Sequence, residues 1–270
     1  MIRVFVITAI LLASSPALSE VFLSDDFETG NFNSPGGTTG FWGAGEATVS
    51  SAASHSGTYS IAFPFTGPTI QKDFNIGTPI TDMYISYWIY FPADYTTNAY
   101  TSGAQNNKLI LVQGEDHDDP MTVDVEFEAL DLAPYGGFKL PRTGSPYTPI
   151  CASPPVSPGY VWGGDFNIQQ YFGQWVHFEW HFKVDTGSGN GAFEFWVNGV
   201  ELFSRTNVVY ENSPPCSPGY WSEGYLMGAP NTDFDPVTTV YIDDVVISDV
   251  RQWAGAAAQS RGTVLLGEPR

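Results

Sequence analysis

The fold is decided by residues 175–184, which read WVHFEWHFKV. Val176, Phe178, Trp180 and Phe182 occupy every second position, and mostly polar side chains stand between them. Strict alternation has the period of a β-strand, whose successive side chains point to opposite faces. The segment therefore predicts a strand with one thoroughly apolar core face.

The motif H-F-E-W-H inside this stretch raises the question of a zinc site. On a helix, His177 and His181 would lie side by side and could hold one zinc ion. On a strand the two positions are about 13 Å apart, whereas zinc–nitrogen bonds measure about 2.0–2.1 Å. The strand period argues against a shared zinc ion. Trp175, His177, Glu179 and His181 remain as a row that either lines a sugar groove or faces water.

The same alternation recurs along the chain. Segments rich in Val, Ile, Phe, Tyr and Trp are separated by clusters of Gly, Pro, Asn and Asp, and helical periodicity is almost absent after residue 19. The clearest segments are 48–51, 59–65, 84–91, 108–112, 122–130, 175–184, 192–197 and 240–247. Eight or more short strands, punctuated by 28 glycines and 20 prolines, predict an all-β fold, a two-sheet antiparallel jelly-roll sandwich.

The two ends of the chain differ from its middle. Residues 1–19, MIRVFVITAILLASSPALS, combine Arg3, an apolar run and a small-x-small ending, and thus predict a signal peptide. The apolar run is too short for a membrane span, and no later segment is apolar for long enough. We expect a secreted protein, extracellular or periplasmic, with a single jelly-roll domain at 20–253 and a flexible tail at 254–270.

Charge and cysteine content narrow the function. The chain has 29 acidic and 10 basic residues and a formal net charge of −19 at pH 7. This charge argues against nucleic acid as a partner, because phosphates need a basic surface. Cys151 and Cys216 are the only cysteines, and in an oxidising compartment they predict one disulfide, worth about 4 kcal/mol in the loop-entropy description. We expect a monomer.

Several segments carry a resemblance to known families. LSDDFETGNF (23–32), SHSGTYSIAF (54–63) and YIDDVVISD (241–249) resemble jelly-roll carbohydrate-binding modules of the concanavalin A-like superfamily. YISYWIYFPADY (84–95), NNKLILV (106–112) and the stretch 173–199 resemble β-jelly-roll polysaccharide lyases related to alginate, glucuronan and heparin lyases. The resemblance implies the sandwich fold, recognition of an extracellular polysaccharide and cleavage of a uronate-containing glycan by β-elimination.

For a lyase, the resemblance singles out Lys108, because related lyases carry a lysine in the same N-K-L context. β-Elimination needs a cation to neutralise the uronate carboxylate, a base for the C5 proton and an acid for the leaving oxygen. Lys108 is the predicted neutralising group. Residue type suggests His177 or His181 as the base and Tyr87 or Tyr135 as the acid.

Residues 123–128 offer a different chemistry. On a strand, Asp124, Glu126 and Glu128 share one face with neighbours about 6.6–7 Å apart, which suits the carboxylate pair of a glycosidase. The segment resembles the E-x-D-x-E strand of laminarinase-type hydrolases, although the order here is D-x-E-x-E. A glycoside hydrolase and a noncatalytic carbohydrate-binding or adhesive module are therefore alternatives to a lyase, and a solvated acidic face is the simplest interpretation of this segment.

Further residues are predicted to contact a glycan. Aromatic rings can stack on sugar faces, and a local basic cluster around Lys108 could offset the acidic surface. The predicted substrate-binding residues are Trp175, Glu179, Lys139, Arg142, Trp162 and Trp221.

The resemblance also implies a structural calcium ion. In related modules, a D-x-E of the first strand, a loop and an aspartate of the last strand converge on one ion, and their hard oxygen ligands suit Ca²⁺. Here these positions are Asp26, Glu28, the backbone of residues 54–57, and Asp243. The acidic run 115–119 is a weaker second candidate.

Overall fold

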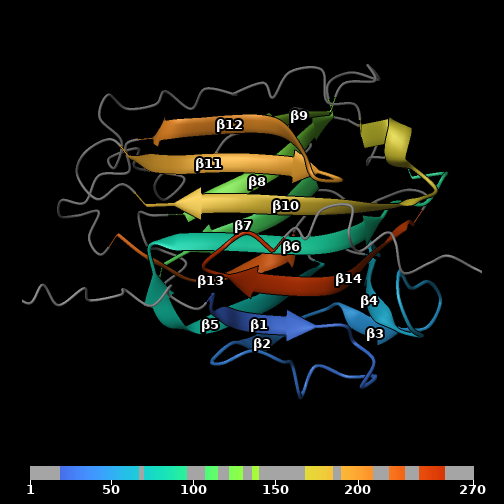
Figure 1. Cartoon of the computed structure of the whole chain (residues 1–270). Coiled ribbons are helices and arrows are strands. Elements are labelled where there is room, and N and C mark those ends of the chain that lie inside the picture. Colours follow the sequence, from blue (N-terminus) through green and yellow to red (C-terminus); the bar gives the residue numbers. More distant parts are fainter. Residues whose placement is uncertain are drawn as a thin grey trace, which may run out of the picture.

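Figure 1 shows a computed structural model of the chain, which describes residues 19–66, 70–95, 107–114, 122–129, 136–139, 168–184, 190–208, 219–228 and 237–252. The predicted signal peptide up to residue 18, both cysteines of the predicted disulfide and the tail from 254 onward lie outside the described residues. These expectations stay predictions.

Two antiparallel sheets form a sandwich, which confirms the predicted all-β jelly-roll fold. The eight-stranded sheet lies in front in Figure 1 and contains both the first and the last described strands. Its strands, in spatial order, are β12 (Val200–Val208), β11 (Gly191–Val197), β10 (Trp175–Lys183), β6 (Asp82–Tyr90), β14 (Thr239–Ser248), β4 (Ser60–Pro64) and β3 (Thr48–Ser50), and β1 (Val21–Asp25) pairs with β14.

The six-stranded sheet lies behind. Its order is β2 (Phe41–Gly45), β5 (Gln71–Ile80), β13 (Trp221–Met227), β7 (Asn107–Gln113), β8 (Thr122–Ala129) and β9 (Gly136–Lys139). One 3₁₀ turn, η1 (Ile168–Tyr171), precedes β10. Within the described ranges, no helix is long and apolar enough to cross a membrane.

Strand β10 is an inner strand of the eight-stranded sheet, and the burial of its side chains confirms the core face predicted from the sequence. It pairs along its whole length with β6, and on its other side with β11. Val176, Phe178, Trp180 and Phe182 are each 0% exposed and belong to the core between the sheets. The alternate positions of β10 consequently lie on the outer face of this sheet.

Two residues predicted to contact a glycan belong to the core instead. Tyr87 is fully buried, and its hydroxyl accepts a hydrogen bond from the Trp180 indole at 3.0 Å. Trp221 is also 0% exposed, and its indole donates to the Phe182 carbonyl at 3.1 Å. The roles predicted for Tyr87 and Trp221 are wrong, because neither side chain can reach a ligand outside the sandwich.

Candidate functional site

The residues predicted for a lyase site are divided between the two outer surfaces of the sandwich. His177 and His181 are outward positions of β10 in the eight-stranded sheet, whereas Lys108 is on β7 of the six-stranded sheet. The core lies between the sheets, whose faces pack about 10 Å apart. The predicted combination of either histidine with Lys108 in one site is therefore wrong.

Strand register brings a different set of positions together on the six-stranded sheet. Lys108 of β7 pairs with Glu126 of β8, which in turn pairs with Lys139 of β9. Directly paired positions share a face of the sheet. Val125 pairs with the core residue Ile110 and therefore occupies a core-facing position. Glu126 is the next residue of the strand and occupies the opposite, outer face, together with its partners Lys108 and Lys139. A carboxylate position is thus flanked by two lysine positions.

A hydrogen-bonded polar row crosses the same face. The Glu223 carboxylate accepts hydrogen bonds from the Gln113 amide at 2.9 Å and from the Asn75 amide at 3.3 Å. Gln113 is only 6% exposed, and its Oε1 has no hydrogen-bond partner. Phe41, which pairs with Asn75, is 52% exposed. Gln113 on β7 offers an unused acceptor oxygen, and Phe41 on β2 offers an exposed ring at the other end of this row. Groups of these kinds bind sugar hydroxyls and sugar faces.

Tyr225 is the residue of this face that the sequence did not reveal. It pairs with Leu111 of β7 and Asp73 of β5, between the polar row and the lysine row, and it is 7% exposed. Among the described strands of the six-stranded sheet, β13 supplies the only tyrosine. Strand β13 thus places a tyrosine on the same face as Lys108.

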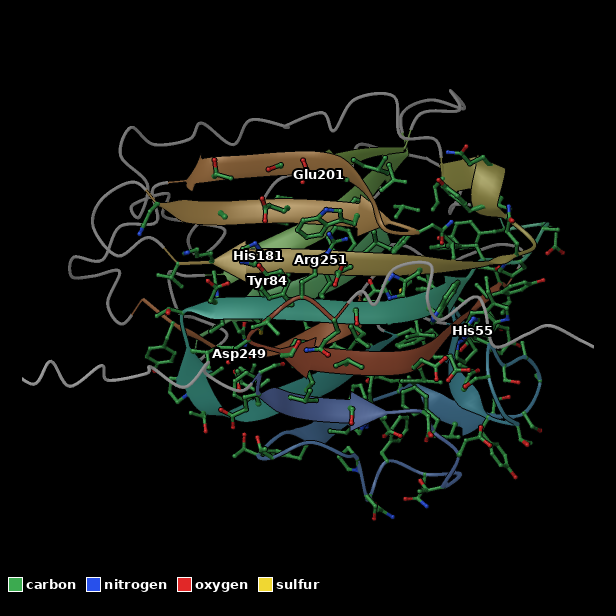
Figure 2. All side chains as sticks on the ribbon, in the orientation of Figure 1. His55, Tyr84, His181, Glu201, Asp249 and Arg251 are labelled. Carbon is green, nitrogen blue, oxygen red and sulfur yellow. The ribbon has the colours of Figure 1, made fainter. Side chains whose placement is uncertain are left out.

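The outer face of the eight-stranded sheet carries the H-F-E-W-H row, and most of that row is buried. His177 is 8% exposed, Glu179 0% and His181 5%. The alternative that these three residues face water is therefore wrong. Figure 2 shows Tyr84, His181 and Arg251 close together over the middle of this face, with His55 toward the end where β10 begins.

His181 is held between two carboxylates. Its Nδ1 lies 2.6 Å from Glu194 Oε2, and its Nε2 lies 2.5 Å from Asp82 Oδ1. Both ring nitrogens of His181 are thus within hydrogen-bond distance of a carboxylate oxygen. The ring stacks on Tyr84 at 4.0 Å. Burial, followed by the charges of Asp82 and Glu194, raises the pKa of Tyr84 to about 12. His181 is fully engaged and has no nitrogen left to act as a base.

Glu179 is neutralised by the C-terminal segment of the described chain. Arg251 Nε donates to Glu179 Oε2 at 2.6 Å, and the guanidinium lies 4.2 Å from the centroid of the Trp196 ring. The other oxygen, Oε1, is buried without a hydrogen-bond partner. Arg251 therefore covers a buried carboxylate and ties the segment after β14 onto the sheet (Figure 2).

His177 is kept neutral by its surroundings. Burial, then the nearby His55 and Arg251, lower the pKa of His177 to about 4. His55 stacks on Trp88 at 3.8 Å and bonds Asp244 through Nδ1 at 2.7 Å. A neutral, buried imidazole of this kind contributes to packing on the outer face.

Only some of the predicted calcium ligands lie near one another, and the carboxylates of Glu28 and Asp243 already accept hydrogen bonds from backbone amides. Glu28 Oε1 accepts from the amides of Thr58 and Tyr59, each at 2.8 Å. Asp243 accepts from the amides of residues 55, 56 and 244 at 2.8–3.1 Å. Among the described residues, no three His, Cys, Asp or Glu side chains are grouped to hold a metal. The three carboxylates thus do not fit as one shared ligand set, and calcium stays a prediction.

The remaining predicted residues are not placed with their side chains. Tyr135, Arg142 and Trp162 lie outside the described residues. For Lys108, Glu126, Glu128 and Lys139 the structure describes the backbone pairing, and their roles stay predictions.

Comparisons with known proteins support the fold. No protein family profile matches the sequence, and no curated protein matches it. Among solved structures, the chain is similar to the cellulose-induced protein Cip1, with 20% identity over 85% of this chain and 98% of that one and a TM-score of 0.52.

Two alginate lyases are similar as well. One is a mutant of Aly36B in complex with an alginate trisaccharide, at 12% identity over 87% of this chain and 100% of that one, with a TM-score of 0.54. The other is vAL-1 from Chlorella virus, at 12% identity over 77% of this chain and 91% of that one, with a TM-score of 0.53. These likenesses confirm the jelly-roll sandwich and its structural resemblance to β-jelly-roll polysaccharide lyases.

Proposed function

We propose that this chain is a secreted polysaccharide-binding protein, which takes its ligand across the outer face of the six-stranded sheet and cleaves a uronate-containing glycan there by β-elimination. The observation that carries the proposal is the register of Lys108, Glu126 and Lys139 beside Tyr225 on one face. Two of the similar structures are those of alginate lyases, which supports the same class of substrate.

The reaction can be assigned to residues of this face. A base removes the C5 proton of the uronate, the C4–O bond breaks, a C4=C5 double bond forms and the leaving oxygen takes a proton. Lys108 neutralises the substrate carboxylate and makes the C5 proton more acidic. Tyr225 is the phenol assigned to the proton transfer, because it lies on the same face as Lys108. Gln113 and Asn75 orient the sugar hydroxyls.

The acidic surface sets the conditions of the assay. Asp73 and Glu223 lie on this face, and the whole chain carries a net charge of −19. Such a surface repels a polyuronate at long range, and salt screens this repulsion beyond about 8 Å at 0.15 M. Binding and cleavage should therefore be measured at or above this ionic strength.

A panel of alginate, glucuronan and glycosaminoglycans tests the proposal. The wild-type protein should release products with the ultraviolet absorbance of an unsaturated uronate from at least one polymer. Lys108→Ala and Tyr225→Phe should each reduce the rate about 100-fold, with unchanged melting. Lys183→Ala is the matched control, because Lys183 lies on the other sheet and pairs only loosely with Asp82, at 3.4 Å; its rate should equal the wild-type rate.

The alternatives give different results in the same panel. A hydrolase releases reducing sugar without the ultraviolet signal and loses activity when Glu126 and Glu128 are both changed to Gln. A noncatalytic module is retained on a glycan column and releases no product. Either result would overturn the β-elimination, and absence of all binding would overturn the glycan-binding role.

A further inference from the structure

A row of aromatic side chains crosses three strands of the eight-stranded sheet, on the surface opposite the proposed cleavage face. Trp175 of β10 pairs with Tyr90 of β6, which pairs with Tyr241 of β14. The ring centroids are 5.6 Å apart between Trp175 and Tyr90, and 6.3 Å apart between Tyr90 and Tyr241. All three are partly exposed. The row spans about 10 Å across the strands, enough for about two pyranose rings.

The polar ends of these side chains are unused. Within the described part of the chain, the hydroxyls of Tyr90 and Tyr241 and the indole N–H of Trp175 make no hydrogen bond. Tyrosine and tryptophan usually place such groups against a partner when they are buried, and use them for recognition at binding surfaces. The row therefore offers apolar ring faces together with free hydrogen-bonding groups.

A cavity adjoins the row. It has a volume of about 220 Å³ and is lined by Tyr90, Tyr241, Pro92, Asp94, Thr239 and the neighbouring residues 237–238. Asp94 is exposed, and within the described residues its carboxylate has no ion-pair or hydrogen-bond partner. The cavity thus adds a carboxylate acceptor and a threonine hydroxyl beside the rings.

We propose that this surface is a second glycan-binding site and that its ligand is a neutral polysaccharide. Sugar C–H faces pack on aromatic rings, and sugar hydroxyls satisfy phenol, indole and carboxylate groups. The charge of the surroundings selects against a uronate, since the exposed carboxylate of Asp94 lines the cavity. The site does not depend on the proposed cleavage face, because the core separates the two surfaces.

Calorimetric titration of the full chain with cellohexaose, xylohexaose and mannohexaose tests this proposal. At least one of these neutral hexasaccharides should bind the wild type. Tyr90→Ala and Trp175→Ala should weaken its affinity tenfold or more. Tyr90→Phe and Tyr241→Phe remove only a hydroxyl and should weaken it about threefold to tenfold, which keeps the test valid where an alanine variant fails to fold. Leu202→Ala, an exposed apolar residue of β12 (38% exposed), should bind like the wild type.

Three results would overturn the proposal. The first is that none of the neutral hexasaccharides binds at millimolar concentration. The second is that their affinity is the same in the Tyr90 and Tyr241 variants as in the wild type. The third is that light scattering shows a changed oligomeric state for Trp175→Ala while no glycan binds. That result would make the row an interface between copies of the chain. Loss of uronate binding in Lys108→Ala, with neutral-glycan binding retained, would support two separate sites.

Discussion

Replacing Arg251 by alanine should remove the countercharge of a fully buried carboxylate. Glu179 is 0% exposed and keeps one oxygen without a hydrogen-bond partner even in the intact protein. Breaking a buried ion pair by removing one partner costs about 3–5 kcal/mol, and the contact with Trp196 is worth about 0.5–1 kcal/mol. The Arg251 side chain is 35% exposed, so water can partly hydrate Glu179 in the variant. We therefore expect a loss of about 3 kcal/mol.

Urea unfolding at pH 7 measures this loss as a lower midpoint with an unchanged slope. Glu179→Gln should cost less, because the remaining guanidinium can reach water, and the double variant should cost about 1 kcal/mol more than Glu179→Gln, because it also loses the contact with Trp196. The double-mutant cycle should give a coupling energy of about 2 kcal/mol. Lys183→Ala is the matched control: it breaks an exposed pair and should cost about 0–1 kcal/mol. A cost below about 0.5 kcal/mol for Arg251→Ala, or a coupling near zero, would show that Arg251 does not compensate the charge of Glu179.

Acid stability, core packing and calcium binding can each be measured on the folded protein. The pKa of His177 is about 4 in the folded state, below its unfolded value near 6.5. Between these two pH values the unfolded state therefore binds more protons than the folded state. The free energy of unfolding should fall by about 3 kcal/mol as the pH drops from 6.5 to 4. His177→Gln should flatten this part of a pH-dependent urea series, and an unchanged slope would contradict it. Gly224→Ala would place a Cβ against the Leu111 carbonyl and should lower stability by about 2–3 kcal/mol in thermal melts, whereas equal melting would contradict the strand pairing of β13. A calcium ion near Asp243 predicts a lower melting temperature in EGTA than in calcium, and identical melting in both would count against it.

The alternation of residues 175–184 was enough to predict β10 and its core face, because the period of a strand depends on local geometry alone. Strands β5 and β13 were missed for local reasons. Lys72 occupies a core-facing position of β5, where its ammonium donates to the Gly43 carbonyl and lies over the Phe32 ring. Gly224 interrupts the apolar pattern of β13. Both residues weaken a signal that depends on side-chain hydrophobicity.

The composition of the candidate site was less predictable. Period assigns each residue to a face of its own strand, but the sheet to which a strand belongs depends on pairing between distant segments. The sequence therefore placed His177 with Lys108, which lie on opposite surfaces. Tyr225 was missed because its strand was missed. The pairing of Lys108 with Glu126 and Lys139 required the register, which only the structure provides.

Binding of the glycan to the outer face of the six-stranded sheet is the step on which the proposed function depends. Affinity electrophoresis at 0.15 M salt, in gels that contain alginate or glucuronan, measures this binding. It compares the wild type, Lys108→Ala and the control Lys183→Ala, which lies on the other sheet. One polymer should retard the wild type and Lys183→Ala equally, whereas Lys108→Ala should lose about tenfold or more in affinity with unchanged melting. Equal retardation of all three proteins, or retardation of none, would contradict binding at this face.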